Sequence, residues 1–207
     1  MIYKRIIKRA VDTLLASLGT LVILIPMGII AIAIKLDSRG PVIFKQKREG
    51  ENRKAFNVYK FRTMCDHAYV IGGIAKNSDD SRITKVGAFL RRTSLDEIPQ
   101  FFNIIKGDMS IIGPRPILDW EFDEYAENQE YHKRFAVLPG MFCTVDLDLR
   151  AQASRDVQFK MDAEYAEHIT FKSDVKAFFG IIKTVVSGKN VYKEYTNKEE
   201  NEHGLHV

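Results

Sequence analysis

An uncharged apolar stretch of 22 residues, from position 13 to position 34, limits what this chain can fold into more than any other feature of its sequence. A helix of that length crosses the hydrocarbon core of a bilayer. The basic residues that flank the stretch are Lys4, Arg5, Lys8 and Arg9 before it and Lys35, Arg39, Lys45, Lys47 and Arg48 after it. Because basic flanks prefer the cytoplasmic side, a straight single span would leave one flank on the unfavourable side.

Pro26 lies just past the middle of this stretch, and a proline inside a helix removes a hydrogen bond and bends the axis. We therefore expect a re-entrant helix-break-helix that enters the membrane, turns at Pro26 and returns, with both basic flanks on one face. The carbonyl near Val22 that loses its partner must be satisfied within the protein, since lipid offers none. Two alternatives stay open: a simple transmembrane span, and a signal peptide in which Ala31-Ile32-Ala33 imitates a cleavage site.

The chain as a whole has the composition of a folded protein, with 45% hydrophobic and 28% charged residues among 207. We divide it into a membrane hairpin over 1–36, a cytoplasmic domain over 37–190 and a polar tail over 191–207. Its two cysteines, Cys65 and Cys143, are too few for a disulfide framework, so we expect reduced thiols. The net charge is +4, with an excess of basic residues in the first 62 positions. This asymmetry favours a surface that faces anionic lipid or phosphate.

The body is expected to be mainly helical, in the α+β class, with one small antiparallel β-hairpin formed by 42–46 and 55–61. Basic and aromatic residues interleave along this hairpin, a pattern that also occurs in RNA-binding proteins. A half-buried hairpin whose polar face meets lipid headgroups is the simpler interpretation. The other segments expected are a loop over 67–81, helices over 88–92, 117–135, 157–169 and 173–186, and a strand over 141–149.

Two adjacent carboxylates, Asp96 and Glu97, precede Pro99, which is best tolerated in the first turn of a helix. We expect a helix that begins at about Asp96, ends at Gly107 and carries one apolar face, made of Ile98, Phe101, Phe102 and Ile105. The amphipathic segment over 101–112 would dock the body on the membrane. A helix N-terminus keeps a carboxylate ionised and attracts phosphate.

Acidic residues in a first helical turn are by themselves ordinary caps, so only the residues around this pair can indicate a function. Arg91 and Arg92 lie just upstream, and the rigid turn Gly113-Pro114-Arg115-Pro116 lies just downstream. The planar fork of an arginine matches phosphate oxygens. An ionised carboxylate is a competent nucleophile toward phosphorus, so the set is typical of phosphate chemistry.

These segments together resemble the small monotopic phosphoglycosyl transferases of the bacterial sugar transferase family. The matching pieces, in order over residues 1–186, are Lys8-Arg9 with Asp12, the apolar run broken at Pro26, GPVIFKQ at 40–46, YKFRTM at 59–64, SRITKVG at 81–87, LRRTSLDEIPQ at 90–100, KGDMS at 106–110 and GPRP at 113–116.

The resemblance implies an enzyme that moves a phosphosugar from a UDP-sugar to polyprenol (undecaprenyl) phosphate, and so initiates glycoconjugate assembly. It implies a monotopic protein at the cytoplasmic face of the bacterial inner membrane, with Mg²⁺ as cofactor. The partners are then the UDP-sugar, the polyprenol phosphate and membrane lipid, with no nucleic acid. A homodimer is one option for the oligomeric state.

The resemblance also implies roles for individual residues. Asp96 would be the nucleophile that attacks the β-phosphate and releases UMP, with the metal against it, and Glu97 would assist the movement of protons and charge. The substrate-binding residues would be Lys60, Arg62, Arg91, Arg115 and Arg150, and the supporting acids would be Asp162 and Asp174. A divalent cation and arginines agree with the physical need to hold a negative substrate against a negative nucleophile.

The chain departs from the family pattern in two places. Ile25 stands where many relatives carry a serine before the membrane proline. The run over 141–150 lacks the usual Gly-Trp and Asn-Gly-Arg pattern, and Arg155 replaces a usual tryptophan. These departures put the sugar preference in question more than the chemistry.

Two other functions remain open on the sequence. A membrane-docked adaptor without enzymatic activity would use the basic hairpin to bind anionic lipid, and Asp96 would then be only a helix cap. A tethered phosphohydrolase would use water as the acceptor and would not need polyprenol phosphate.

Overall fold

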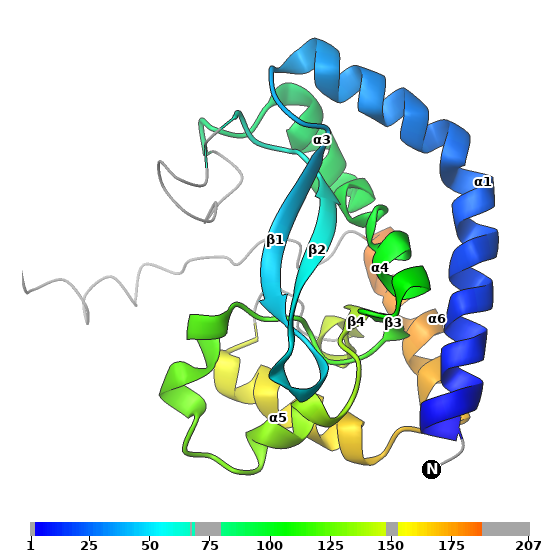
Figure 1. The fold of residues 1–207 in the computed structure, drawn as a ribbon, viewed down its shortest axis with the longest axis vertical. Helices are drawn as coiled ribbons and strands as arrows, with labels where there is room; N and C mark the ends of the chain where they lie inside the picture. Colours follow the sequence, from blue (N-terminus) through cyan, green and yellow to red (C-terminus); the bar gives the residue numbers. More distant parts are fainter. Residues whose placement is uncertain (1–2, 67, 69–79, 148–152, 188–207) are drawn as a thin grey trace, which may run out of the picture.

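The computed structural model describes residues 3–66, 68, 80–147 and 153–187. Arg150, the tail over 191–207 and most of the expected loop over 67–81 lie outside these ranges. Within them, a long N-terminal helix runs beside a mainly helical body that contains one antiparallel hairpin (Figure 1). The α+β, mainly helical class expected from the sequence is therefore confirmed.

The long helix α1 spans Lys8–Asp37 and follows a short π-helical turn, η1, over Tyr3–Ile7. Pro26 lies inside α1, which stays continuous in its helical backbone but changes direction partway along (Figure 1). The helix is long and apolar enough to span a membrane, with a mean hydropathy of 2.5 over its most apolar window. Its apolar side chains face outward: Leu21, Val22 and Ile25 are 72–78% exposed. Such a surface is suited to lipid rather than to water.

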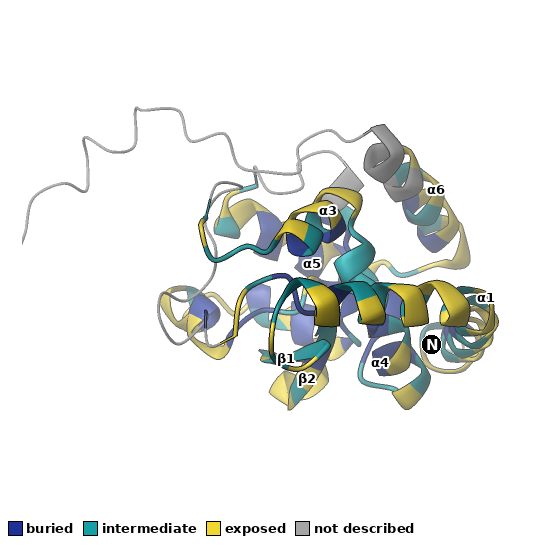
Figure 2. Cartoon of the chain, turned by 90° about the horizontal axis from the view of Figure 1, so that it is seen from above, coloured by how far each residue is buried: buried dark blue, intermediate teal, exposed yellow. Residues whose placement is uncertain are grey.

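Figure 2 shows α1 coloured as exposed or intermediate over most of its length, whereas buried residues gather in the body beside it. The face of α1 that does contact the body packs most closely on α4, where a Cβ at Gly19 would lie 3.2 Å from Cε1 of Phe101. A glycine at this position therefore brings the two helices together.

The hairpin pairs β1, Ile43–Glu49, with β2, Ala55–Phe61, in antiparallel register. Phe44 lies opposite Lys60, and Lys45 lies opposite Tyr59. The 3₁₀ turn η2, Glu51–Arg53, joins the strands, and Asn52 has a left-handed φ of 55° there. The predicted hairpin is confirmed, with a first strand that runs three residues further than expected.

The helix expected to begin at Asp96 is shorter than predicted. Helix α3, Lys85–Thr93, ends at Ser94 in the left-handed conformation, and a 3₁₀ turn, η3, then covers Leu95–Glu97. Helix α4 begins only at Gln100 and ends at Lys106, capped by Gly107 with a φ of 99°. Asp96 and Glu97 therefore lie on a separate turn that precedes the helix, because Pro99 supplies no N–H and the chain closes i→i+3 bonds on either side of it.

The buried face of α4 also differs from the prediction. Phe102 is 42% exposed, whereas Asn103 and Ile104 are fully buried. The Asn103 side chain reaches β2, where Oδ1 accepts from the N–H of Tyr59 at 2.9 Å and Nδ2 donates to the carbonyl of Asn57 at 2.7 Å. A buried amide satisfied in this way fixes α4 against the hairpin.

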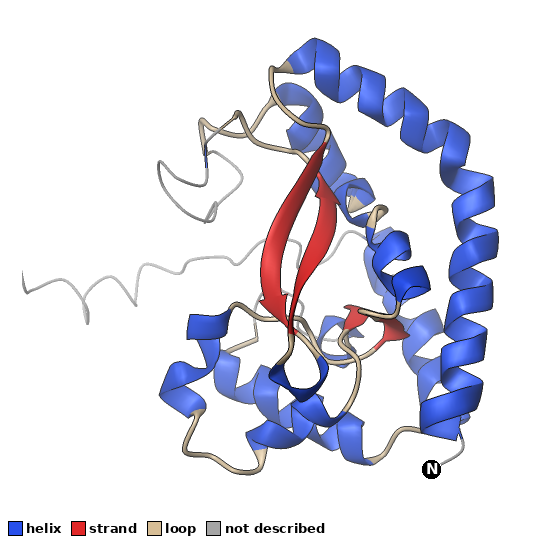
Figure 3. Ribbon diagram, viewed as in Figure 1, coloured by secondary structure: helices blue, strands red, loops and turns tan. Residues whose placement is uncertain are grey.

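Two short strands, β3 over Ser110–Ile112 and β4 over Gly140–Phe142, pair in parallel (Figure 3). A Cβ at Gly140 would lie 2.1 Å from the backbone nitrogen of Gly113, so only glycine permits this approach. The strand expected over 141–149 is thus much shorter, and a 3₁₀ segment, η6, Thr144–Leu147, follows it.

The prediction of a single helix over 117–135 was wrong. This segment forms two 3₁₀ pieces, η4 over Asp119–Tyr125 and η5 over Tyr131–Ala136, which wrap around α5, Arg155–Glu167. Phe122 and Phe159 are fully buried there, and Phe122 meets Phe135 edge-on at 5.0 Å. Helix α6, Phe171–Ser187, completes the described chain and packs its buried Ala177 in one cluster with Ala16 of α1.

Candidate active site

The carboxylate pair lies on η3, where the body meets the second half of α1. Leu95 and Ile98, the neighbours of the pair in sequence, pack around the buried cluster of Ile34, Phe61 and Leu90. Met27 and Ile30 of α1 pack around the same cluster. The apolar side chains on either side of Asp96 and Glu97 therefore fix the pair beside the part of α1 that follows Pro26.

Lys60 is brought to this pair by β2. Its Nζ lies 2.7 Å from Oε1 of Glu97, and both side chains are partly exposed, at 26% and 30%. The contact joins the hairpin to η3 across 37 residues of sequence. The structure thus places together three of the predicted site residues: Lys60, Asp96 and Glu97.

Asp96 is half-buried, and its environment changes its acidity. Burial raises the pKa of Asp96 to about 6, because desolvation disfavours the charged form. The positive charges of Lys60 and Arg91 oppose this effect, and the negative charge of Glu97 adds to it. A carboxylate of this kind is ionised at neutral pH and is more basic than an ordinary aspartate, which suits a nucleophile.

Arg91 approaches the same site from α3. Its Nε donates to Oγ1 of Thr63 at 2.9 Å, and its charge lowers the pKa of Asp96. The structure therefore gathers Arg91 with the carboxylate pair, as the sequence predicted.

Arg62 has partners other than those predicted. The residue is 6% exposed, and its guanidinium donates to carbonyls at the end of α1 and just beyond it: Pro41 at 2.6 Å, Ser38 at 2.7 Å and Ile34 at 3.2 Å. Carbonyls at a helix C-terminus lack partners within the helix, and a cation satisfies them well. These contacts favour an anchor for α1, and a substrate-binding role for Arg62 stays only a prediction.

Arg115 is exposed on the turn over 113–116, and a buried ion pair contacts the backbone of that turn. Nη2 of Arg134 donates to the carbonyl of Arg115 at 2.7 Å and to Oδ2 of Asp162 at 2.7 Å. The side chains of Arg134 and Asp162 are 2% and 0% exposed. Burial raises the pKa of Asp162, and Arg134 opposes that rise. Asp162 therefore holds the turn that presents Arg115.

Asp174 joins three elements at the base of α1. It accepts hydrogen bonds from the hydroxyls of Tyr3 and Tyr165 and from Nζ of Lys8, each at 2.7 Å. Burial and the charge of Asp174 raise the pKa of Tyr165. Asp174 thus acts as a structural joint between α1, α5 and α6.

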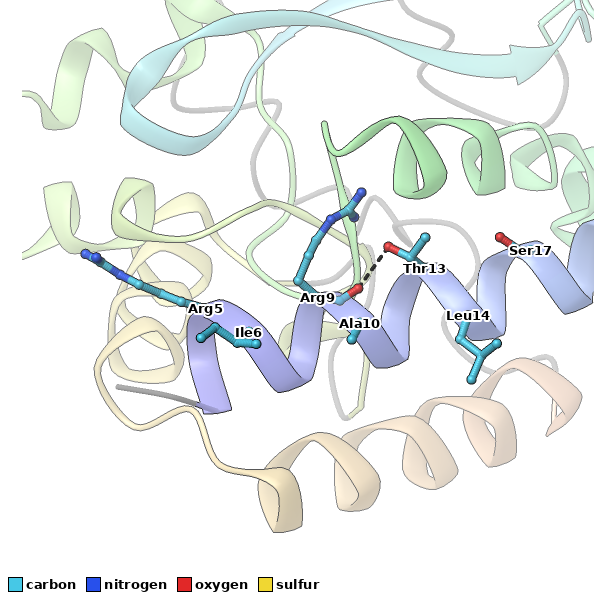
Figure 4. A pocket seen from close by; sticks show the side chains of 7 residues that line it. All are labelled: Arg5, Ile6, Arg9, Ala10, Thr13, Leu14 and Ser17. Carbon is cyan, nitrogen blue, oxygen red and sulfur yellow. Dashed lines mark hydrogen bonds between the residues drawn. The ribbon is translucent and has the colours of Figure 1, made fainter.

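Sequence reasoning did not predict several of the polar contacts that hold these elements together. Arg9 donates from α1 to the carbonyls of Ile104 at 2.6 Å and Ile105 at 3.0 Å, at the end of α4. Figure 4 shows the Arg9 side chain extending away from α1 beside the residues that line a pocket. A pocket beside Arg9 is lined by α1 and η1 alone and contains none of the predicted site residues. Thr63 lies in the motif quoted at 59–64, but its contact with Arg91 was not predicted. Asn103 was overlooked, although a polar residue inside an apolar helix was a visible signal.

Asp96 and Glu97 are the acids available for a metal at this site. Among the residues that the structure describes, no three His, Cys, Asp or Glu side chains form a metal-binding cluster. Mg²⁺ commonly binds through one or two carboxylates together with substrate phosphates, so the pair fits such an ion without further protein ligands.

Comparison with known proteins agrees with the family resemblance seen in the sequence. Residues 3–188 match the family described as bacterial sugar transferases. The chain is 37% identical over 198 residues to the exopolysaccharide production protein PSS of Rhizobium leguminosarum bv. phaseoli, covering 89% of this chain and 98% of that protein.

Two longer proteins are also similar. One is a UDP-N-acetylgalactosamine-undecaprenyl-phosphate N-acetylgalactosaminephosphotransferase of Aeromonas hydrophila, 36% identical over 88% of this chain. The other is a UDP-glucose:undecaprenyl-phosphate glucose-1-phosphate transferase of Escherichia coli, 39% identical over 94% of this chain. The match spans only 44% and 41% of these two relatives.

Proposed function

Because the chain belongs to the bacterial sugar transferase family, we propose that it transfers a sugar phosphate from a UDP-sugar to polyprenol phosphate at a membrane surface. The observation that carries the proposal is the position of Asp96: a half-buried carboxylate beside Lys60 and Arg91, on a turn packed against an apolar membrane helix. Two relatives whose names specify undecaprenyl phosphate as acceptor support it.

In the first step, a carboxylate oxygen of Asp96 attacks the β-phosphorus of the UDP-sugar. The bond from this phosphorus to the bridging oxygen breaks, and UMP leaves with the electron pair. The sugar phosphate is then held on Asp96 as an acyl phosphate. The raised pKa of Asp96, about 6, makes its oxygen a stronger nucleophile while it stays ionised at neutral pH.

In the second step, a phosphate oxygen of the polyprenol phosphate attacks the same phosphorus. The bond to Asp96 breaks, the free carboxylate is restored, and the product is a polyprenyl diphosphate sugar. Glu97 lies beside Asp96 and accepts a proton if the acceptor phosphate arrives protonated. Its ion pair with Lys60, at 2.7 Å, holds the Glu97 side chain in a fixed orientation.

The negative substrate requires positive groups around it. The charge of Arg91 acts on Asp96 from α3, so Arg91 is suited to bind a phosphate oxygen there. Arg115, exposed on its supported turn, is proposed to bind the substrate further from Asp96. Mg²⁺ bound by Asp96 and the diphosphate would supply further charge neutralisation.

The membrane arrangement follows from α1. Both ends of the helix carry basic residues, and the segment after Pro26 packs beside the carboxylate pair. A re-entrant helix would keep both ends at the cytoplasmic surface and place Asp96 at headgroup level, where a polyprenol phosphate presents its phosphate.

The test is UMP release by the detergent-purified protein with Mg²⁺ and a panel of UDP-sugars, with and without polyprenol phosphate. Glucose and N-acetylgalactosamine head the panel, because the two long relatives differ in these sugars. We expect release that depends on the lipid and falls about 10³-fold or more in Asp96→Asn.

The other functions give different results. Release of sugar phosphate without lipid would instead indicate a phosphohydrolase. No release with any donor, from a folded and membrane-bound protein, would contradict the proposal and favour the adaptor.

A further inference from the structure

The end of β2 and the start of α3 are tied together at residues 63–65. Met64 and Ile83 form an antiparallel bridge. The N–H of Cys65 donates to the carbonyl of Arg82 at 2.8 Å, and the N–H of Thr84 donates to the carbonyl of Thr63 at 3.0 Å. The chain that leaves the hairpin therefore has a fixed position relative to the first turn of α3.

Gly87 brings α3 onto the backbone of Thr63. A Cβ at Gly87 would lie 2.0 Å from the carbonyl oxygen of Thr63 and 2.6 Å from its carbonyl carbon. No real Cβ tolerates such distances, so the absence of a side chain is what allows the contact. The side chain of Thr84 caps the helix at this point by accepting from the N–H of Gly87 at 3.0 Å.

Arg91 lies four residues after Gly87 and therefore on the same face of α3. Its Nε donates to Oγ1 of Thr63 at 2.9 Å, and Thr63 is 7% exposed. Within the described part of the chain, the side chain of Arg91 makes no other hydrogen bond. Thr63 thus holds the inner nitrogen of the guanidinium and leaves the two outer nitrogens for another partner.

A guanidinium is planar, so a fixed Nε also fixes the direction of the outer fork. The charge of this fork already acts on Asp96. We infer that Thr63 is a positioning residue, which Gly87 brings into reach of Arg91, and which aims the Arg91 fork at the phosphate of the substrate beside Asp96. The inference rests on the proposed function, since that function gives Arg91 a phosphate to bind.

The first test compares Thr63→Val, which removes the acceptor but keeps the shape, with Thr63→Ser, which keeps a hydroxyl. We expect kcat/KM for the UDP-sugar to fall about 10-fold in Thr63→Val and to stay within about twofold of wild type in Thr63→Ser. Thr93→Val is the matched control, because Thr93 lies on the same helix and its hydroxyl, among the residues that the structure describes, bonds only to helix carbonyls.

A double-mutant cycle that combines Thr63→Val with Arg91→Lys distinguishes the positioning of Arg91 by Thr63 from a general structural effect of the Thr63 substitution. Lysine keeps the charge but has no Nε for Thr63 to hold. If Thr63 acts through Arg91, Thr63→Val causes no further loss in the Arg91→Lys background. An equal loss in both backgrounds would overturn the inference, even with the transferase activity established.

The second test does not require activity. The Arg91 Nε–H, identified by its loss from the ¹⁵N NMR spectrum in Arg91→Lys, should exchange slowly with solvent in wild type and in Thr63→Ser. It should exchange rapidly in Thr63→Val. Rapid exchange in wild type would contradict the inference, whereas absence of UMP release from wild type would contradict only the proposed function.

Discussion

Asp96 combines two properties at the scale of a single residue. It must be ionised to attack phosphorus, yet its surroundings favour the protonated form and raise its pKa to about 6. Its neighbours act in opposite directions, because Lys60 and Arg91 lower this pKa and Glu97 raises it. Substitution of each neighbour should therefore shift the pH dependence of the reaction in a direction set by the charge that is removed.

We predict that kcat/KM for UMP release rises as the pH increases through about 6, as Asp96 loses its proton. Lys60→Met removes an opposing positive charge, so this acid limb should move to higher pH. Glu97→Gln removes a negative charge and also frees Lys60, so the limb should move to lower pH. A pH–rate profile of each variant measures this, and a limb that stays fixed in both would contradict the assignment to Asp96.

We also predict that Asp96→Asn makes the protein inactive but more stable near neutral pH. The folded pKa is raised above 3.8, so the native state binds its proton more tightly than the unfolded chain does. Asp96 therefore lowers the free energy of unfolding as the pH rises from about 4 to about 6. Thermal unfolding in detergent should show a higher midpoint for the variant at about pH 7.5 and no gain at about pH 4. An equal gain at both values would show that ionisation is not the cause.

The candidate site was predictable where its residues lie within one short motif or beside it in space. Asp96, Glu97 and Arg91 lie within seven residues of sequence, and a hairpin of clear alternation presents Lys60. Arg62 should share the face of Lys60 by the same alternation, but β2 ends at Phe61. Beyond that end the N–H of Arg62 still donates to the carbonyl of Val42, but its side chain binds the C-terminus of α1 instead. Periodicity does not show where a strand stops, so the contact of Arg62 with α1 could not be predicted from the sequence.

At the scale of elements, glycines set the distances between helices and their neighbours. Gly19 brings α4 onto α1, and Gly87 brings α3 onto Thr63. These contacts depend on pairs far apart in sequence, so the composition of each helix gave no sign of them. The segment over 117–135 was misjudged for a related reason: its many acidic residues are typical of a solvated helix, whereas Phe122, Tyr131 and Phe135 are buried around Phe159.

Gly87→Ala should destabilise the protein by about 2 kcal/mol, because α3 must move away from a backbone carbonyl that a Cβ would meet at 2.0 Å. For a chain of this size the midpoint of thermal unfolding should fall by about 4–8 °C. Gly28→Ala is the matched control, since a Cβ there meets nothing within 4 Å. Equal midpoints for the two variants would show that α3 shifts at no cost.

At the scale of the whole molecule, α1 and the body form one unit. Arg9 and Lys8 bind the start of α1 to α4 and α6. Arg62, just after β2, donates to carbonyls at the end of α1 and in the loop that follows it, so the helix has polar contacts to the body near both of its ends. A helix held in this way carries the body with it at the membrane surface. The sequence predicted the apolar helix and its basic flanks, but not the polar joints that fix its orientation.

We predict that both ends of α1 lie on the cytoplasmic side. In a background of Cys65→Ser and Cys143→Ala, Arg5→Cys and Arg39→Cys place single thiols at exposed positions on either flank. A membrane-impermeant maleimide should label both in inverted vesicles and neither in intact spheroplasts. Labelling of one thiol from each side would instead establish a simple span.

The amide of Asn103 has a consequence for solubility. A hairpin of two strands has two open edges, and unpaired backbone groups on an edge invite strand addition from other molecules. Asn103 occupies the N–H of Tyr59 and the carbonyl of Asn57 on the outer edge of β2, and the carbonyl of Ile117 pairs with the N–H of Glu49 on the edge of β1. A single buried side chain thus covers the middle of one edge, and its loss would expose that part of the hairpin to intermolecular β-aggregation.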